Sequence, residues 1–168
     1  MLSYIKKRTN KMGGILTAMK ISKLSFSKVE REGDYPGKIV YANFNIDGKS
    51  MKEMSSIREF DVVSCLGWGP KPFQNEQILR LLLEKESDFI YNRNSLYICP
   101  CTGLDCGAVS LSIKKANNGI IVWDNFALEY ENGIDKYFDN IGPFYFEWEQ
   151  YKNAIENTLF LGEPDYFH

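Results

Sequence analysis

The chain has 168 residues, of which 44% are hydrophobic and 25% are charged, and its formal net charge is −2 with a pI near 5.5. This length fits a single domain with a sizeable buried core. The acidic balance argues against a general nucleic-acid binder, because such proteins usually carry a basic face that meets phosphate. A basic protein partner would suit this composition better.

The N-terminal part is predicted to be a flexible leader over residues 1–18, followed by a single domain over residues 19–168. Its early Lys and Arg residues precede an apolar run that Gly13, Gly14 and Lys20 interrupt, so it lacks the continuous apolar stretch of a signal peptide. Nothing elsewhere approaches the roughly 18 apolar residues that span a bilayer. We therefore expect a cytoplasmic protein with reduced thiols and no membrane partner.

The first strong strand signal lies in residues 38–54, where apolar residues alternate with others and then meet Asp47-Gly48. This dipeptide favours a two-residue hairpin turn, since both central positions need a positive φ. The alternating apolar residues of this segment are Val40, Ala42, Phe44 and Ile46. A further apolar run follows in residues 60–68.

Two amphipathic helices are predicted. The first lies in residues 71–86, with Pro72 as its entry residue, and the second lies in residues 142–160, after Pro143. Apolar residues recur three or four positions apart in both segments, as expected of helices that bury one face. These residues are Ile78, Leu79, Leu82 and Leu83 in the first helix and Trp148, Tyr151, Ile155 and Leu159 in the second.

The clearest hairpin lies between the two helices. Residues 108–113 alternate apolar and polar side chains, Asn117-Asn118-Gly119 marks a turn, and a second apolar run continues through residues 120–123. The chain is therefore predicted to be a single α+β domain. Hairpins form an antiparallel β-sheet, and about two amphipathic helices pack on one face of it.

Three of the four cysteines, Cys99, Cys101 and Cys106, form a C-x-C-x4-C pattern. A structural zinc site has four ligands in a tetrahedron, so this pattern would need Cys65 or the only histidine, His168, as the fourth. A redox role has less support, because the thioredoxin-type motif is C-x-x-C at a helix N-terminus. The spacing here differs from that motif, and the residues after Cys106 resemble a strand. The preferred interpretation is small buried side chains beside a glycine-rich turn, since free cysteine is among the most buried residue types. We therefore expect neither a metal nor another cofactor.

No complete catalytic constellation can be assembled from the sequence. His168 is the only histidine and the last residue, so a nucleophile–histidine pair would rest on the end of the chain. The G-x-G in residues 67–69 lacks the third glycine of a dinucleotide-binding fingerprint. We therefore predict no catalytic residues and no enzyme activity.

Five segments, LGWG, LRLLL, LYICPCTGLDCGAVSLSI, IIVWDNFAL and GPFYFEWEQY, occur in that order over about residues 66–154. Together they resemble a little-characterised bacterial group with the motifs LY-x-C-x2-C-G-x3-C-G, V-x-W-x-x-F and F-x-F-x-x-x-Q-Y. Some members are labelled oxidoreductases, and such small proteins also resemble the immunity proteins of polymorphic and contact-dependent growth inhibition toxin systems. This chain departs from the pattern at Cys101, which comes one position early, and at Thr102. The matching residues are Cys99, Cys106, Gly107, Trp123, Phe126, Phe144, Phe146, Gln150 and Tyr151.

The resemblance to immunity proteins implies a protein that binds and neutralises a cognate toxin, such as a nuclease domain, by one-to-one occlusion. Interfaces favour aromatic side chains, and complementary charge selects the partner. The expected surface is therefore the acidic and aromatic stretch of residues 124–148. The alternative is a small zinc- or thiol-dependent enzyme that uses the three clustered cysteines. The predicted partner-binding residues are Asp124, Glu129, Tyr130, Glu131, Asp135, Tyr137, Phe138 and Asp139.

Overall fold

The computed structural model describes residues 3–8, 16–32, 38–159 and 161. It is an α+β domain built from antiparallel sheets with helices packed on them, as the sequence predicts. The larger sheet has six strands in the order β10-β9-β8-β7-β6, with β11 also paired to β9, and the smaller sheet has the order β3-β4-β5. The larger sheet consists of β6 (Val63–Ser64), β7 (Arg93–Ile98), β8 (Ala108–Lys115), β9 (Ile120–Tyr130), β10 (Gly133–Tyr137) and β11 (Phe144–Glu147). The smaller sheet consists of β3 (Leu24–Glu32), β4 (Lys38–Ile46) and β5 (Lys49–Ser50).

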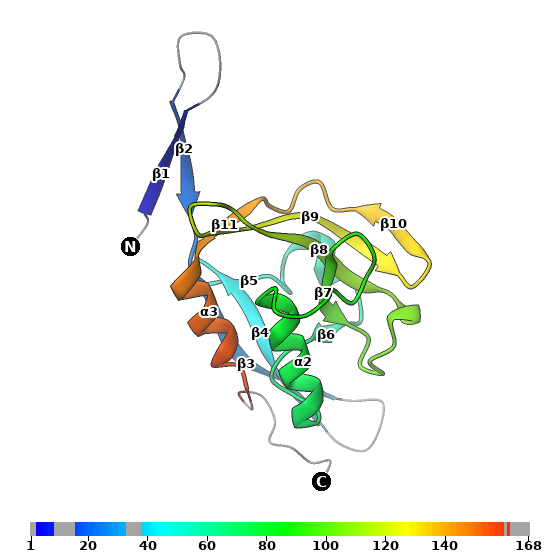
Figure 1. Cartoon of the computed structure of the whole chain (residues 1–168). Coiled ribbons are helices and arrows are strands. Elements are labelled where there is room, and N and C mark those ends of the chain that lie inside the picture. Colours follow the sequence, from blue (N-terminus) through cyan, green and yellow to red (C-terminus); the bar gives the residue numbers. More distant parts are fainter. Residues whose placement is uncertain (1–2, 9–15, 33–37, 160, 162–168) are drawn as a thin grey trace.

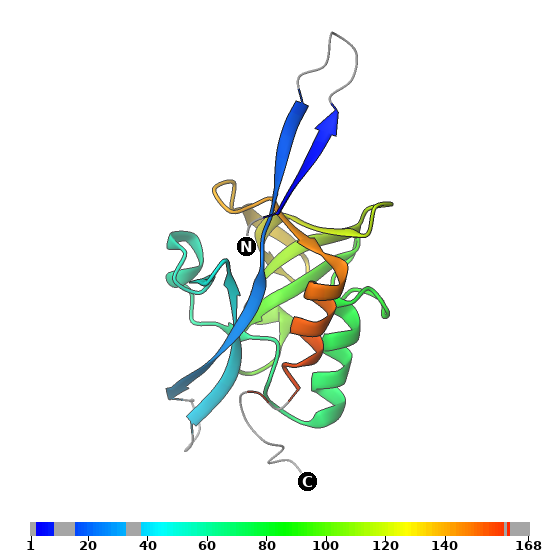
Figure 2. The ribbon, with the colours of Figure 1, turned by 90° about the vertical axis from the view of Figure 1, so that its left-hand side faces the viewer.

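The helices are α1 (Ser55–Arg58), α2 (Lys71–Leu81) and α3 (Trp148–Glu156), and a short 3-10 helix, η1 (Leu104–Cys106), lies between β7 and β8. Figure 1 shows α2 and α3 side by side on the body of the domain. Figure 2 shows them toward one side of the domain and most of β3 and β4 toward the other, while α3 contacts the start of β3. Among the described parts of the chain, no helix has the length and apolar character that a membrane crossing requires.

The predicted leader contains two strands in this structure. β1 (Ser3–Arg8) and β2 (Leu16–Ile21) form an antiparallel hairpin that extends away from the body (Figure 1). Just after β2, the backbone N–H of Ser22 donates to the carbonyl oxygen of Tyr145 at 2.7 Å, which attaches the base of the hairpin to β11.

The two predicted hairpins are confirmed. Asp47 and Gly48 form the turn between β4 and β5, and both have the positive φ that such a turn requires, 52° and 80°. The second hairpin pairs β8 with β9 and turns at residues 116–119. These two turns depend on a few neighbouring residues, so the sequence is sufficient to place them.

The first predicted helix is present as α2, but only part of its predicted apolar face is buried. Ile78 and Leu82 are buried, whereas Leu79 and Leu83 are 37% and 40% exposed. The helix ends at Leu81, so Leu82 and Leu83 lie beyond it. Leu83 has a φ of 61° and does not continue the buried face of the helix. Gln74 and Gln77 take part of the buried face, and Gln74 donates through Nε2 to the carbonyl oxygen of Gly69 at 2.8 Å.

The core is centred on the fully buried Trp123 of β9. Its ring makes edge-to-face contacts with Phe44, Phe126, Phe146 and Tyr151, at centroid distances of 5.8, 6.4, 5.1 and 5.9 Å. These rings belong to β4, β9, β11 and α3, respectively. One indole ring therefore joins the smaller sheet, the larger sheet and the C-terminal helix.

Helix α3 is attached to the rest of the domain by two polar side chains. The amide of Gln150 accepts from the N–H of Leu24 at 3.0 Å and donates to its carbonyl oxygen at 2.6 Å. The buried hydroxyl of Tyr151 accepts from Trp123 Nε1 at 3.3 Å and donates to the carbonyl oxygen of Leu81 at 2.6 Å. Burial raises the pKa of the Tyr151 hydroxyl, so this group stays a proton donor.

We expect Tyr151→Phe to lower the free energy of unfolding by about 1–3 kcal/mol, because Leu81 O and Trp123 Nε1 would lose their partner inside the core. Chemical denaturation measures this difference. Tyr91→Phe is the matched control, since the Tyr91 side chain is 86% exposed and the change should leave stability unaltered. Equal stability of the two variants would contradict the role given to the Tyr151 hydroxyl.

Candidate functional site

Three of the predicted partner-binding residues lie together around one open hollow. Tyr130, Glu131 and Asp135 line it with Asp105 and Asn132, and its volume is about 600 Å³. We call this feature the acidic hollow. Tyr130 ends β9, Glu131 and Asn132 form the tip of the β9–β10 hairpin, and Asp135 lies on β10.

The acidic hollow is closed on one side by the β7–β8 loop. Asp105 comes from η1, and the Tyr130 ring packs so closely on Gly107 that a Cβ there would lie 2.9 Å from a ring carbon. Within the parts of the chain that the structure describes, Asp105, Glu131 and Asp135 form no ion pair. Three carboxylates around one hollow therefore create a negative potential that a cationic group would relieve.

Glu129 is not a surface residue, which corrects the sequence-based expectation. It is 2% exposed and pairs with Arg93, whose Nε donates to its Oε2 at 2.9 Å. The Arg93 guanidinium also donates to Ser110 Oγ at 2.9 Å and to the carbonyl oxygen of Asn125 at 2.7 Å. The carboxylate thus neutralises a buried cation that spans β7, β8 and β9, so it is not available to a partner.

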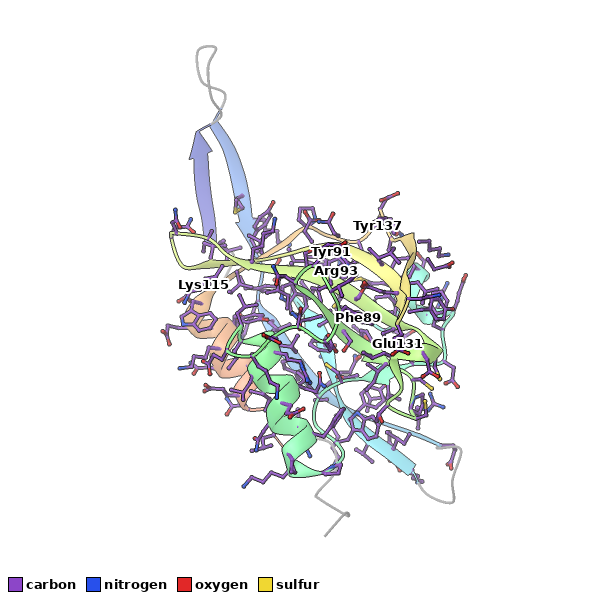
Figure 3. The ribbon with its side chains drawn as sticks, turned by 45° about the vertical axis from the view of Figure 1, so that its right-hand side comes forward. Phe89, Tyr91, Arg93, Lys115, Glu131 and Tyr137 are labelled. Carbon is purple, nitrogen blue, oxygen red and sulfur yellow. The ribbon has the colours of Figure 1, made fainter. Side chains whose placement is uncertain are left out.

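Tyr137 covers this ion pair from outside. Its ring centroid lies 5.8 Å from the Arg93 guanidinium carbon, a cation–π distance, while 52% of the residue stays exposed. Figure 3 shows Tyr137 and Glu131 at different ends of the β10 hairpin, with Arg93 lying on the sheet. Tyr137 is therefore held by the sheet beneath it and still accessible.

The remaining predicted binding residues are Asp124, Phe138 and Asp139, and they differ in burial. Phe138 is buried against Phe60 at a ring-centroid distance of 6.0 Å, so the expectation that it anchors a partner is wrong for this conformation. Asp124 is half-buried, and its Oδ1 accepts from the N–H of Asn125 at 2.7 Å where β9 bulges. Asp139 is exposed but does not line the acidic hollow.

We expect Glu129→Gln to destabilise the domain by about 3–5 kcal/mol, because the change leaves the Arg93 charge buried without its counter-ion. The matched control is Glu131→Gln, two positions along the chain at an exposed site, which should change stability by less than about 0.5 kcal/mol. Urea titration followed by fluorescence compares the two. A small effect of Glu129→Gln would show that the ion pair contributes little to the fold.

The three clustered cysteines meet on the surface. Their Sγ atoms all lie within 4.8 Å of one another, and those of Cys101 and Cys106 are 3.3 Å apart. Cys99 is half-buried, Cys101 and Cys106 are exposed, and all are free thiols. We call this group the cysteine cluster.

Local turns bring the cysteine cluster together. After β7, the N–H of Thr102 donates to the carbonyl oxygen of Cys99 at 2.8 Å, which closes a turn with Pro100 inside it. η1 then returns Cys106 to the same side, and the N–H of Gly103 points at Cys101 Sγ at 3.4 Å. The interpretation of these cysteines as buried packing residues is therefore wrong for Cys101 and Cys106.

Cys65, the fourth cysteine, is separate from the cysteine cluster. It is fully buried, and its Sγ lies 3.5 Å from the carbonyl oxygen of Ser95. Burial raises the pKa of this thiol well above its ordinary value, so it stays protonated and suits packing. Cys65 is therefore not the fourth ligand that a zinc site would need, and His168 lies outside the described residues.

The three thiols of the cysteine cluster are not equivalent. Hydrogen bonds from the Cys99 thiol and the Gly103 N–H lower the pKa of Cys101. The pKa of Cys99 is raised, first by its partial burial, and the hydrogen bond to Cys101 raises the pKa of Cys106 to about 12. Cys101 is therefore the thiol of the cysteine cluster that loses its proton most readily.

We expect iodoacetamide to modify Cys101 first in the reduced protein with EDTA present. A lowered pKa gives Cys101 more of the reactive thiolate at neutral pH, whereas Cys106 stays protonated until the solution is strongly alkaline. Peptide mass spectrometry at successive times gives the order of labelling. Faster labelling of Cys106, which is also exposed, would contradict the greater acidity assigned to the Cys101 thiol.

No family model, curated protein or solved structure matches this chain in comparisons with known proteins. The resemblance to immunity proteins therefore stays a prediction. The sequence-based prediction of the site omitted three residues, Asp105, Asn132 and Arg93. Asp105 lies between two clustered cysteines and could have been included by proximity, and Arg93 is a charged residue at the start of an otherwise buried strand.

Proposed function

We propose that this protein binds and neutralises a basic toxin domain, as an immunity protein does, through the acidic hollow and the neighbouring exposed face of β10. Binding is one-to-one and blocks the active site of the toxin or its access to substrate. The observation that carries the proposal is that Tyr130, Glu131 and Asp135, together with Asp105, line one hollow.

The charge of the acidic hollow fits a cationic side chain of a partner. Toxin nucleases bind phosphate in basic clefts, and carboxylates can occupy the positions that phosphates would take. Asp105 and Asp135 come from separate elements and face one space, so a lysine or arginine could contact more than one carboxylate. Such contacts mainly speed and select association.

Tyr137 supplies the aromatic part of the same surface. Exposed tyrosines held in place by their surroundings are frequent centres of interfaces, because they bury a large area at a low cost in conformational entropy. Its contact with Arg93 holds the ring over the sheet before a partner arrives. The buried ion pair of Arg93 and Glu129 therefore supports the surface without being part of it.

The test is co-expression with a toxin domain encoded beside this protein, scored by growth and by co-purification. Rescue of growth with a stable complex supports the proposal, whereas no rescue and no complex would sink it. A gene neighbourhood without a toxin domain would favour the enzyme alternative instead.

In that complex, we expect Glu131→Lys to slow association by about tenfold at low salt and to reduce its salt dependence, because the steering charge is reversed. Glu84→Lys makes the same change in net charge outside the acidic hollow and should have little effect. Tyr137→Ala should instead speed dissociation, with a loss of about 2 kcal/mol in binding free energy, while Tyr137→Phe keeps the ring and most of the affinity. Surface plasmon resonance separates the two rates, and equal effects of the two charge reversals would exclude the hollow as the docking site.

The second candidate is thiol chemistry at the cysteine cluster, which the exposure and lowered pKa of Cys101 favour. The two functions differ in their response to Cys101→Ser. A neutralising protein should keep complex formation when this variant stays folded by circular dichroism. A folded variant that forms the complex but no longer protects cells would favour the thiol-dependent function.

A further inference from the structure

The cysteine cluster has two ordinary explanations, and neither fits it. Buried cysteines are explained by packing, but Cys101 and Cys106 are exposed. A disulfide would join two of the sulfur atoms and would not explain the position of the third. All three Sγ atoms, however, lie within 4.8 Å of one another. Three thiols that converge on an exposed loop are the arrangement in which thiolates bind a soft metal ion.

We propose that Cys99, Cys101 and Cys106 bind one zinc ion. In a tetrahedral zinc site with Zn–S bonds of about 2.3 Å, the sulfur atoms lie about 3.8 Å apart. The separation of Cys101 and Cys106 Sγ is 3.3 Å, and no pair in the cluster exceeds 4.8 Å. The ligands therefore reach bonding geometry by shifts of about an ångström or less in their side chains. The cysteine ligands are not among the residues that line the acidic hollow, so metal binding can be tested without a partner.

The electrostatics of the loop favour a cation. When the three thiols lose their protons, the resulting thiolates repel one another unless a positive ion lies between them. The Asp105 carboxylate adds negative charge, with its Oδ1 4.0 Å from Cys106 Sγ. Zinc binding would release the thiol protons to solvent and cancel this repulsion. The N–H of Gly103, which donates to Cys101 Sγ, provides the kind of hydrogen bond that orients thiolate ligands around a metal.

The backbone leaves little freedom at Gly103. A Cβ there would lie 2.5 Å from Asp105 Oδ1 and 3.4 Å from Cys101 Sγ, so a larger residue would displace the carboxylate and crowd the sulfur. Because Cys101 and Cys106 are exposed, the fourth position of the tetrahedron is open to water. The metal would tie the β7–β8 loop into one rigid unit at the edge of the acidic hollow, since Asp105 belongs to both.

The experiment measures metal on the full-length protein, purified without chelators under reducing conditions. We expect native mass spectrometry and elemental analysis to give one zinc per chain after desalting. Replacement by Co²⁺ should give thiolate-to-cobalt charge-transfer bands and the visible bands of a tetrahedral ion. Each of Cys99→Ser, Cys101→Ser and Cys106→Ser should weaken these bands, whereas Cys65→Ala removes a cysteine outside the cluster and should keep them.

Three outcomes would overturn the proposal. They are the absence of any cobalt–thiolate band in the reduced wild-type protein, bands that persist in all three serine variants, and zinc that desalting removes completely. If the serine variants do not fold, the proposal is tested on the wild-type protein by the protection of its cysteines from alkylation. Zinc should shield Cys99, Cys101 and Cys106 from iodoacetamide until a chelator is added, and unchanged labelling rates would refute the site.

Discussion

The fold depends on the environment of one indole ring. Trp123 contacts aromatic rings from β4, β11 and α3, and its Nε1 hydrogen-bonds to Tyr151, which in turn holds the end of α2 through Leu81. Sheets and helices that are far apart in sequence therefore share one buried contact. Aromatic pairs in edge-to-face contact are worth about 0.5–1.5 kcal/mol each beyond the area they bury, so this cluster couples the elements strongly.

The residues that carry the resemblance fall into two groups in the structure. Six of them belong to the aromatic core, pack on it or attach α3 to it: Trp123, Phe126, Phe144, Phe146, Gln150 and Tyr151. The other three, Cys99, Cys106 and Gly107, lie in the loop between β7 and β8. The aromatic motifs are thus explained by folding alone, and the cysteine loop is the part of the pattern that packing leaves unexplained.

Local features were predictable, while contacts between distant residues were not. The turn at Asp47-Gly48 and the approach of three cysteines within eight positions follow from short-range preferences. The second helix was only partly predictable: it spans Trp148–Glu156 rather than residues 142–160, because Phe144–Glu147 pair with β9 as strand β11. Glu129 reads as a surface charge because its partner Arg93 is 36 residues away. Phe138 was misplaced for a similar reason, since its neighbour Phe60 lies in another part of the chain. Alternation indicates which face a side chain occupies, but it does not reveal whether another segment covers that face.

The link between Gln150 and Leu24 has a consequence for the order in which the domain forms. A side-chain amide here takes the position of a neighbouring strand at the start of β3 and joins residues 126 positions apart. Contacts of such high sequence separation carry a large loop-closure cost and slow folding relative to local ones. The face of β4 that carries Phe44 has the same dependence, because Phe44 packs on Tyr97 and Trp123, which come much later in the chain. The two earliest strands of the domain body, β3 and β4, can pair locally, but the layer that covers them comes from segments that are synthesised later.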